Sequence, residues 1–228
     1  MLNLFKKTTS SFIPSSQLCW KISPGLVPYE EALFFMEKYV EDIYKKKKPG
    51  CIWLLEHPSL YTYGTSSNFQ EDLCLLPNDL PFPLYETGRG GRITYHGPGQ
   101  RIIYCMIDLK TLSPLPDLKA FVNLLETWII DTLKELKIEA FRQEGLIGIW
   151  VKGRDEKILK IAALGIRVRH WISFHGISLN IDPDLSHYNS IVPCGIQNFG
   201  VTSLRELGYK GTIKDIDYIL KKTCPFKT

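Results

Sequence analysis

Residues 88–100 read Gly-Arg-Gly-Gly-Arg-Ile-Thr-Tyr-His-Gly-Pro-Gly-Gln, and five of these thirteen residues are glycine. Because glycine has no Cβ, such a backbone can approach a ligand closely, and its exposed amide N–H groups can hold a carbonyl or phosphate oxygen. The stretch contains neither the GxGxxG of a dinucleotide-binding loop nor the Gly-Lys-Ser/Thr ending of a P-loop. It predicts either a ligand-binding loop or a tight hairpin turn.

The sequence on either side of this loop predicts an α+β fold, in which helices pack on a central mixed sheet. Apolar residues at helical spacing indicate the helices, and runs rich in β-branched residues interrupted by Gly165 and Gly176 indicate several of the strands. Asp117 and Thr212 are suited to cap two of the helices, and Ser203 and Glu206 have the spacing of a capping box. The predicted helices are 28–45, 117–137, 203–208 and 212–222, and the predicted strands are 51–56, 84–86, 101–109, 146–151, 157–168 and 172–181.

The composition is that of a globular protein: 44% of the 228 residues are hydrophobic and 23% are charged. No linker or repeat divides the chain, so residues 1–228 are expected to form a single domain. The longest stretch without a charged residue, 185–204, contains several polar residues, so no membrane span is expected. The net charge of +4 is small and no stripe of Lys or Arg emerges, so nucleic-acid binding is not expected.

The cysteines and histidines give no sign of a metal site, because the six cysteines form no CxxC pair and the five histidines no HExxH motif. A chain with this much core has little need of disulfides, so reduced thiols in the cytoplasm are expected. The first residues resemble a transit peptide only in lacking acids and in their Ser and Thr content. They are treated as an ordinary N-terminal segment.

Cys194, in Pro-Cys-Gly, is a candidate nucleophile because the preceding apolar run ends there at a turn. A buried core cysteine is the alternative. A nucleophilic thiol needs a neighbouring base or cation to lower its pKa. The candidates are His96, His175 and Lys160, and Lys160 stands inside an apolar strand, where it either reaches solvent or needs a partner.

Four blocks of sequence together resemble the motifs of the lipoyl (octanoyl) transferase family, in the same order. They are Arg-Gly-Gly-Arg-Ile-Thr-Tyr-His-Gly-Pro-Gly-Gln at 89–100, Lys-Ile-Ala-Ala-Leu-Gly-Ile-Arg at 160–167, Phe-His-Gly-Ile-Ser at 174–178 and Pro-Cys-Gly-Ile at 193–196. Four ordered blocks are much more specific than one glycine loop. The resemblance implies the fold shared by lipoate-protein and biotin-protein ligases. Ser178 departs from the family pattern, which often has alanine there.

The resemblance implies an acyltransferase that needs no cofactor. The donor would be octanoyl-acyl carrier protein, and the acceptor a lysine on a lipoyl domain of a 2-oxoacid dehydrogenase E2 subunit or on the glycine cleavage H protein. By resemblance, Cys194 carries the acyl group as a thioester, and Lys160 activates it. The acyl pocket would be lined by Arg89, Gly90, Gly91, Arg92, Ile93, Thr94, Tyr95, His96, Ala163, Leu164, Gly165, Gly176, Ile177 and Ser178.

Two other functions stay open on the sequence. One is an ATP-dependent lipoate-protein ligase on the same fold, which would be indifferent to the loss of Cys194. The other is a noncatalytic module that binds lipoyl groups and transfers nothing.

Overall fold

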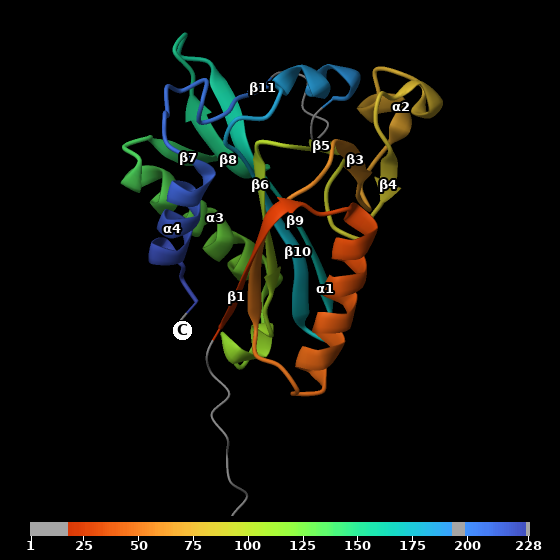
Figure 1. Cartoon of the computed structure of the whole chain (residues 1–228), viewed down its shortest axis with the longest axis vertical. Helices are drawn as coiled ribbons and strands as arrows, with labels where there is room; N and C mark the ends of the chain where they lie inside the picture. Colours follow the sequence, from red (N-terminus) through yellow and green to blue (C-terminus); the bar gives the residue numbers. More distant parts are fainter. Residues whose placement is uncertain (1–17, 193–198, 227–228) are drawn as a thin grey trace, which may run out of the picture.

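A computed structural model describes residues 18–192 and 199–226 (Figure 1). A mixed sheet of eight strands runs through the molecule in the order β1-β2-β6-β10-β9-β8-β7, with β11 added beside β9. The β1–β2 and β9–β11 pairs are parallel, and the other neighbours are antiparallel. The strands are β1 Cys19–Leu26, β2 Cys51–Glu56, β6 Gln100–Met106, β7 Ala140–Gln143, β8 Leu146–Lys152, β9 Ile158–Arg169, β10 Ile172–Asn180 and β11 Gly200–Val201.

The two faces of this sheet are covered differently. Helices α3 (Leu118–Glu135) and α4 (Ile213–Thr223) cover one face, and α1 (Tyr29–Tyr44) covers part of the other (Figure 1). Beside α1 lies a second sheet of three short strands in the order β4-β3-β5, and the one-turn helix α2 (Phe69–Asp72) lies between β3 and β4 along the chain. Its strands are β3 Leu60–Tyr63, β4 Leu84–Glu86 and β5 Thr94–His96.

Alternation along the strands explains why both faces are apolar. In β2, Ile52 and Leu54 join the core under α3, whereas Trp53 and Leu55 join the core under α1. A strand buried on both faces reads as a continuous apolar run rather than an alternating one. The run Cys-Ile-Trp-Leu-Leu at 51–55 shows this directly, since all five side chains are buried.

The helices begin at the capping residues that the sequence indicates. The side chain of Asp117 accepts hydrogen bonds from the backbone N–H groups of Lys119 and Ala120, at 2.8 and 3.2 Å. Thr212 and Asp215 cap each other reciprocally at the start of α4. Both arrangements satisfy N–H groups that a helix N-terminus otherwise leaves unpaired.

The predicted α+β architecture is therefore confirmed, with three local corrections. Residues 204–208 form turns rather than a helix, although Ser203 Oγ still accepts from the Glu206 N–H. The strand predicted over 101–109 ends at Met106, and Leu109 begins a short 3₁₀ helix. Gly165 and Gly176 do not interrupt their strands but stand opposite each other in the β9–β10 ladder.

The structure also bears on the expectations for membrane spans, cysteines, metal sites and the basic run. None of the helices in the described ranges is long and apolar enough to cross a membrane. The five cysteines outside 193–198 are free thiols, and within 18–192 and 199–226 no cluster of His, Cys, Asp and Glu is arranged to hold a metal ion. Lys45–Lys48 follow α1 as an exposed turn. The single-domain organisation of 1–228 stays a prediction.

A buried ion pair joins β6 to α4. Arg101 donates from Nε and Nη2 to the two carboxylate oxygens of Asp217, at 2.8 and 2.7 Å, and both side chains are buried. A two-point pair of this kind fixes orientation as well as distance. It therefore sets how α4 lies on the sheet.

Replacing Asp217 by Ala leaves the Arg101 guanidinium buried without its carboxylate. We expect Asp217→Ala to lower the free energy of unfolding by about 3–5 kcal/mol, because an unpaired buried charge is strongly unfavourable. Urea denaturation measures this. Glu135→Ala is the control, because it removes an exposed ion pair with Lys222 and should cost at most about 1 kcal/mol. Equal losses in the two variants would contradict this assignment.

Candidate active site

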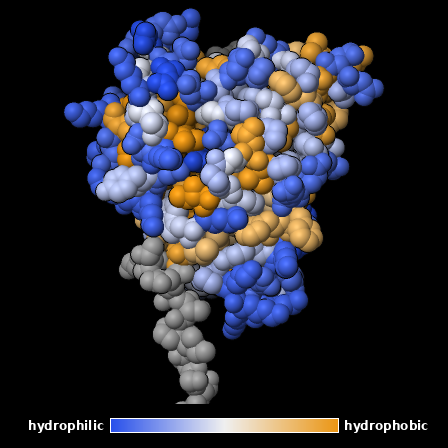
Figure 2. All heavy atoms as spheres, viewed as in Figure 1, coloured by the Kyte–Doolittle hydropathy of each residue, from blue (hydrophilic) through white to orange (hydrophobic). Residues whose placement is uncertain are grey.

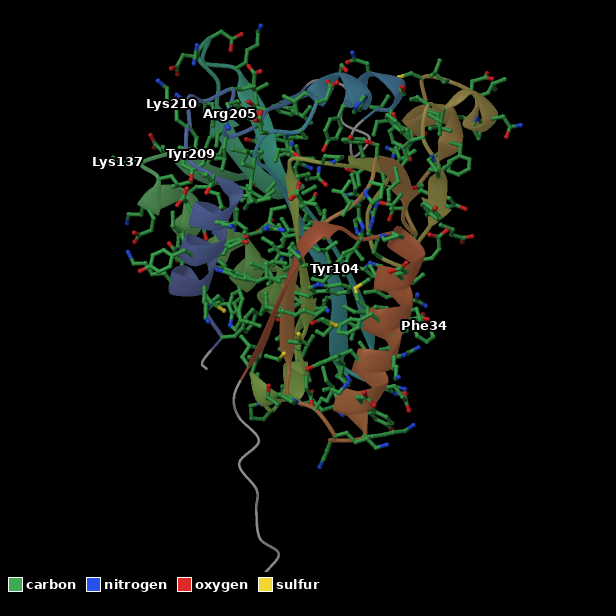
Figure 3. The ribbon with its side chains drawn as sticks, in the orientation of Figure 1. Phe34, Tyr104, Lys137, Arg205, Tyr209 and Lys210 are labelled. Atoms are coloured by element: carbon green, nitrogen blue, oxygen red, sulfur yellow. The ribbon has the colours of Figure 1, made fainter. Side chains whose placement is uncertain are left out.

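A cavity lies between the main sheet, the small sheet and the start of α1. It encloses about 390 Å³ of empty space, part of it open to solvent. Tyr104, which lines it, lies in the middle of the molecule between the sheet and α1, whereas Phe34 points away from the sheet (Figure 3). The other lining residues are Tyr29, Thr62, Thr87, Arg89, Thr94, His96, Ile102, Ala163, Gly165, His175, Gly176, Ile177 and Ser178.

Eight of the residues predicted for an acyl pocket line this one cavity, although they come from three separate segments of the chain. The loop after β4 and strand β5 supply three of them, β9 supplies two and β10 supplies three. They are Arg89, Thr94, His96, Ala163, Gly165, Gly176, Ile177 and Ser178.

Six other predicted residues do not contribute to this lining. Leu164 packs toward the α3 side, because its neighbours in β9 occupy the cavity side. Arg92 forms ion pairs with Asp72, at 2.6 Å, and with Glu71. Tyr95 and Ile93 belong to the core of the small sheet. Gly90 and Gly91 lie in the loop that follows Arg89.

Gly165 and Gly176 line the cavity, and neighbouring residues lie too close to them for a side chain to fit. A Cβ on Gly165 would lie 2.7 Å from Arg89 Cδ, and a Cβ on Gly176 would lie 1.9 Å from the carbonyl oxygen of Ile103. The loop can therefore rest on β9, where the Gly90 N–H donates to the Ile166 carbonyl at 3.1 Å. Any side chain at these two positions would displace the loop or β6.

Arg89 holds the loop in place from inside. Its Nη1 donates to the carbonyls of Gly90 and Arg92, and its Nη2 donates to the carbonyl and hydroxyl oxygens of Thr62, all at 2.8–3.1 Å. The side chain is buried. Arg89 thus lines the cavity and at the same time joins the loop to β3 of the small sheet.

A chain of buried hydrogen bonds continues from Arg89. Because Thr62 Oγ1 accepts from Arg89, its own proton can go to His96 Nε2, 3.1 Å away. His96 Nδ1–H then donates to Gln100 Oε1 at 2.7 Å, which fixes the neutral tautomer. Gln100 Nε2 in turn donates to Asn180 Oδ1 at 2.9 Å. This chain joins the small sheet to β10.

Lys160 lies beside a second, smaller cavity that shares Thr94 and Ala163 with the first. Its place there depends on an irregularity in β9. Trp150 pairs with Lys160 and Ile149 pairs with Ala162, so Ile161 is one residue more than β8 has to match. Ile161 and Ala162, although consecutive, both pack into the core under α3. This is a β-bulge, and it places Lys160 on the cavity side together with Ala163 and Gly165.

The Lys160 side chain is 6% exposed. It crosses Gly148, where a Cβ would lie 2.7 Å from Lys160 Cε, and its Nζ stands 4.8 Å from the centre of the Trp150 ring. A cation over an aromatic face gains about 0.5–2 kcal/mol. The lysine ion pairs found in 18–192 and 199–226 involve other residues, so no acidic side chain there neutralises Lys160.

Cys194 lies outside the described residues, so its contact with Lys160 stays a prediction. On the side that follows it, Phe199 packs on Trp150 with ring centres 5.1 Å apart, and Val201 pairs with Lys160 in the β9–β11 ladder. Among the other cysteines, burial raises the pKa of Cys51 to about 12 and of Cys224 to about 11, and it raises that of Cys105 well above its usual value. These three thiols are unsuited to act as thiolates near neutral pH.

Three buried histidines surround the first cavity, and burial keeps each of them neutral. It lowers the pKa of His57 to about 4 and the pKa values of His96 and His175 to about 3. Neutral imidazoles of such low basicity cannot readily take a proton at neutral pH. Of the three candidate activating groups for the thiol, this leaves Lys160 as the favoured one.

Several residues that line the first cavity could not be identified from the sequence. Tyr29, Thr62, Thr87, Ile102 and Tyr104 lie in ordinary helix, strand and loop sequence, with no motif around them. Asn180, Tyr188 and Val201, beside Lys160, were missed for the same reason. A buried aromatic or hydroxyl residue in a strand looks like core until the facing elements are known.

A family model described as lipoyl protein ligase A/B catalytic domain matches residues 28–224. The chain belongs to this family. The curated octanoyltransferase of Bartonella bacilliformis is 55% identical over 224 residues, which cover 95% of this chain and 89% of that protein. The octanoyltransferase of Parvibaculum lavamentivorans is 50% identical over 208 residues, covering 90% and 89% of the two chains.

Solved structures of the family's ligases have the same fold. A bipartite lipoate protein ligase from Thermoplasma acidophilum superposes with a TM-score of 0.67 at 16% identity, over 92% of this chain and 82% of that one. A lipoate-protein ligase A bound with ATP gives 0.67 at 15% identity, over 92% and 83%. At these identities the likeness concerns the fold alone.

The buried histidines make the stability of this family member depend on pH. Their folded-state pKa values lie below the unfolded value of 6.5, so the unfolded chain binds more protons as the pH falls below 6.5. By pH 5.5 each histidine should cost about 1.4 kcal/mol relative to pH 7.5, and the three together about 4 kcal/mol. Urea denaturation at the two pH values measures this loss.

Substitution of one histidine gives the control for this prediction. His175→Asn should remove about a third of the pH-dependent loss, whereas His170→Asn, at an exposed position, should leave it unchanged. A free energy of unfolding that is the same at pH 5.5 and 7.5 would contradict the buried, neutral state of these rings.

Proposed function

We propose that this chain transfers an octanoyl group from octanoyl-acyl carrier protein to a lysine of a lipoyl domain, by way of a thioester on Cys194. The proposal rests on two neighbouring cavities that share Thr94 and Ala163, one lined by Lys160 and the other by Gly165 and Gly176. A slot lined by Gly165, Gly176 and Ile177 that adjoins the cavity of Lys160 suits an acyl chain with a reactive carbonyl at one end. The octanoyltransferases, 50–55% identical to this chain over most of its length, support the same activity.

In the first step the Cys194 thiolate attacks the carbonyl carbon of the donor thioester. A bond forms between that carbon and Cys194 Sγ, and the bond to the sulfur of the carrier protein breaks. The departing thiolate takes a proton, for which the Lys160 ammonium is the proposed source. One thioester replaces another, so the step is nearly neutral in free energy and consumes no ATP.

In the second step the neutral amine of the lipoyl-domain lysine attacks the Cys194 thioester. An amide forms, Cys194 leaves as a thiolate, and Lys160 accepts the proton that the amine loses. Amide formation drives the reaction, since an amide is more stable than a thioester. Lys160 thus alternates between ammonium and amine.

The two partners are part of this proposal. Carrier proteins and lipoyl domains are typically acidic, and the net charge of +4 would favour encounter with them. On the face shown in Figure 2, apolar side chains lie in separate patches among charged ones, not in one continuous surface. Such a face is suited to brief encounters rather than to permanent complexes.

The covalent intermediate gives the first test. After incubation with octanoyl-acyl carrier protein without ATP, the mass of the chain should rise by one octanoyl group, on the peptide that contains Cys194. Cys194→Ser should lose the stable adduct and the transfer. Cys74→Ser, at an exposed cysteine, is the control and should keep both. Full activity in Cys194→Ala, or a requirement for ATP, would favour the ligase alternative instead.

Lys160 gives the second test. We expect Lys160→Met, which keeps the length of the side chain without its charge, to lower octanoyl transfer by at least about a hundredfold, the usual worth of a positioned acid–base group. It should also raise the pH at which Cys194 is alkylated, because a nearby cation favours the thiolate. Mass spectrometry of the Cys194 peptide after iodoacetamide treatment reads this directly.

The control for Lys160 is Lys157→Met, at an exposed lysine near the start of β9. It should change neither the transfer rate nor the alkylation profile. If Lys160→Met behaves like Lys157→Met, the pairing of Lys160 with Cys194 is wrong.

A further inference from the structure

Two buried polar atoms at one end of the acyl cavity have no hydrogen-bond partner among the described residues. They are Tyr29 Oη and His175 Nε2, and each residue is 3% exposed. Both residues line the cavity. A buried polar group without a partner is rare and unfavourable, so a pair of them in one cavity calls for an explanation.

Their neighbours, by contrast, are satisfied. His57 Nδ1–H donates to the Val27 carbonyl at 2.6 Å, so its Nε2 accepts from the Tyr104 hydroxyl at 2.7 Å. The Tyr29 ring lies 5.7 Å from His57, and the His175 ring lies 6.0 Å from Tyr104. The unpaired atoms therefore belong to an ordered cluster of rings in which the other two members are fully paired.

The backbone of His175 is also unusual. It has a φ of +59° in the middle of β10, a conformation that is unfavourable for a residue with a Cβ. Regular alternation would place its side chain under α3 with Ile177 and Leu179, which belong to that core. Instead the imidazole lies with its ring centre 6.0 Å from that of Tyr104, which packs in the core under α1. Strain that persists inside a strand commonly marks a functional position.

The β9–β10 register places these atoms relative to Lys160. Ala163 lines both cavities and pairs with Ser178, and three residues further along the ladder His175 pairs with Ile166. An extended eight-carbon chain is about 9 Å long, because each of its seven bonds of about 1.5 Å advances the zigzag chain by about 1.3 Å. Three strand residues span about 10 Å. An octanoyl chain that begins beside Ala163 therefore ends at the level of His175.

We propose that Tyr29 and His175 form a polar subsite at the far end of the acyl cavity, which admits a hydrogen-bonding group but not a further methylene, and so limits the acyl chain to eight carbons. This inference rests on the proposed octanoyl transfer. With an octanoyl chain in place, water can pair with both polar atoms. A ninth carbon would displace that water and leave Tyr29 Oη and His175 Nε2 without partners.

Two donors of equal length test the subsite. Nonanoyl and 8-hydroxyoctanoyl groups on the carrier protein differ only in a terminal methyl against a terminal hydroxyl. The unmodified chain should transfer the 8-hydroxyoctanoyl group with the higher kcat/KM. In Tyr29→Phe, which removes only Oη, the ratio of the two kcat/KM values should fall about tenfold, because the buried hydroxyl that rejects the methyl is gone.

Tyr39→Phe is the matched control, since it removes a buried hydroxyl from the same helix away from the cavity. Its ratio should equal that of the unmodified chain. A general loss of structure would lower both rates and leave the ratio unchanged. His175→Asn is a second variant, because asparagine tolerates positive φ and is shorter, and it should lower the ratio in the same direction.

The possible results distinguish a failure of the polar subsite from a failure of the proposed octanoyl transfer. If the unmodified chain transfers no octanoyl group, the proposed function fails, and the role of the subsite fails with it. If octanoyl transfer is normal but the ratio is the same in the unmodified chain, Tyr29→Phe and His175→Asn, the subsite alone is overturned.

Discussion

One extra residue in β9 determines where the chemistry of this fold can occur. Without the bulge at Ile161, strict alternation would place Lys160 on the same side as Ala162 and Leu164, under α3. There it would lie toward the core under α3. With the bulge it faces Trp150, crosses Gly148 and lines the smaller of the two cavities. The face of the main sheet under α3 is apolar core, whereas the opposite face, on which Lys160 lies, forms the candidate active site.

The small sheet and its loop complete the site. Arg89 joins the loop to Thr62, and the hydrogen bonds through His96 and Gln100 carry that connection to β10. These groups are buried, so a partly made chain of hydrogen bonds would be costly, and a fully made one permits few other arrangements. Among the glycines of 88–100, Gly88 lies against the Arg167 side chain of β9, and Gly99, which has a positive φ, lies against the Asp182 backbone. Thr94, His96, Gly165 and Gly176 line the cavity itself.

Much of the fold and part of the site could be predicted from sequence, for different reasons. Helices α1, α3 and α4 and strands β2, β8, β9 and β10 carry strong apolar periodicity or clear caps, so local sequence was enough. Strands β1, β3, β5 and β7 are short or half-exposed and carry no such pattern. The six predicted residues that do not line the cavity share motifs with those that do, and only the strand register separates Leu164 from Ala163. The bulge at Ile161 could not be predicted, because it depends on how β8 pairs with β9.

The proposed octanoyl transfer requires the octanoyl chain to lie on Gly165 and Gly176 with its carbonyl beside Lys160. A crystal structure of the chain carrying octanoate as a thioester on Cys194 tests this directly. We expect density for the acyl chain between Gly165 and the loop that contains Arg89, with the thioester carbonyl within hydrogen-bond reach of Lys160 Nζ. An acyl chain bound elsewhere, or a thioester far from Lys160, would contradict it.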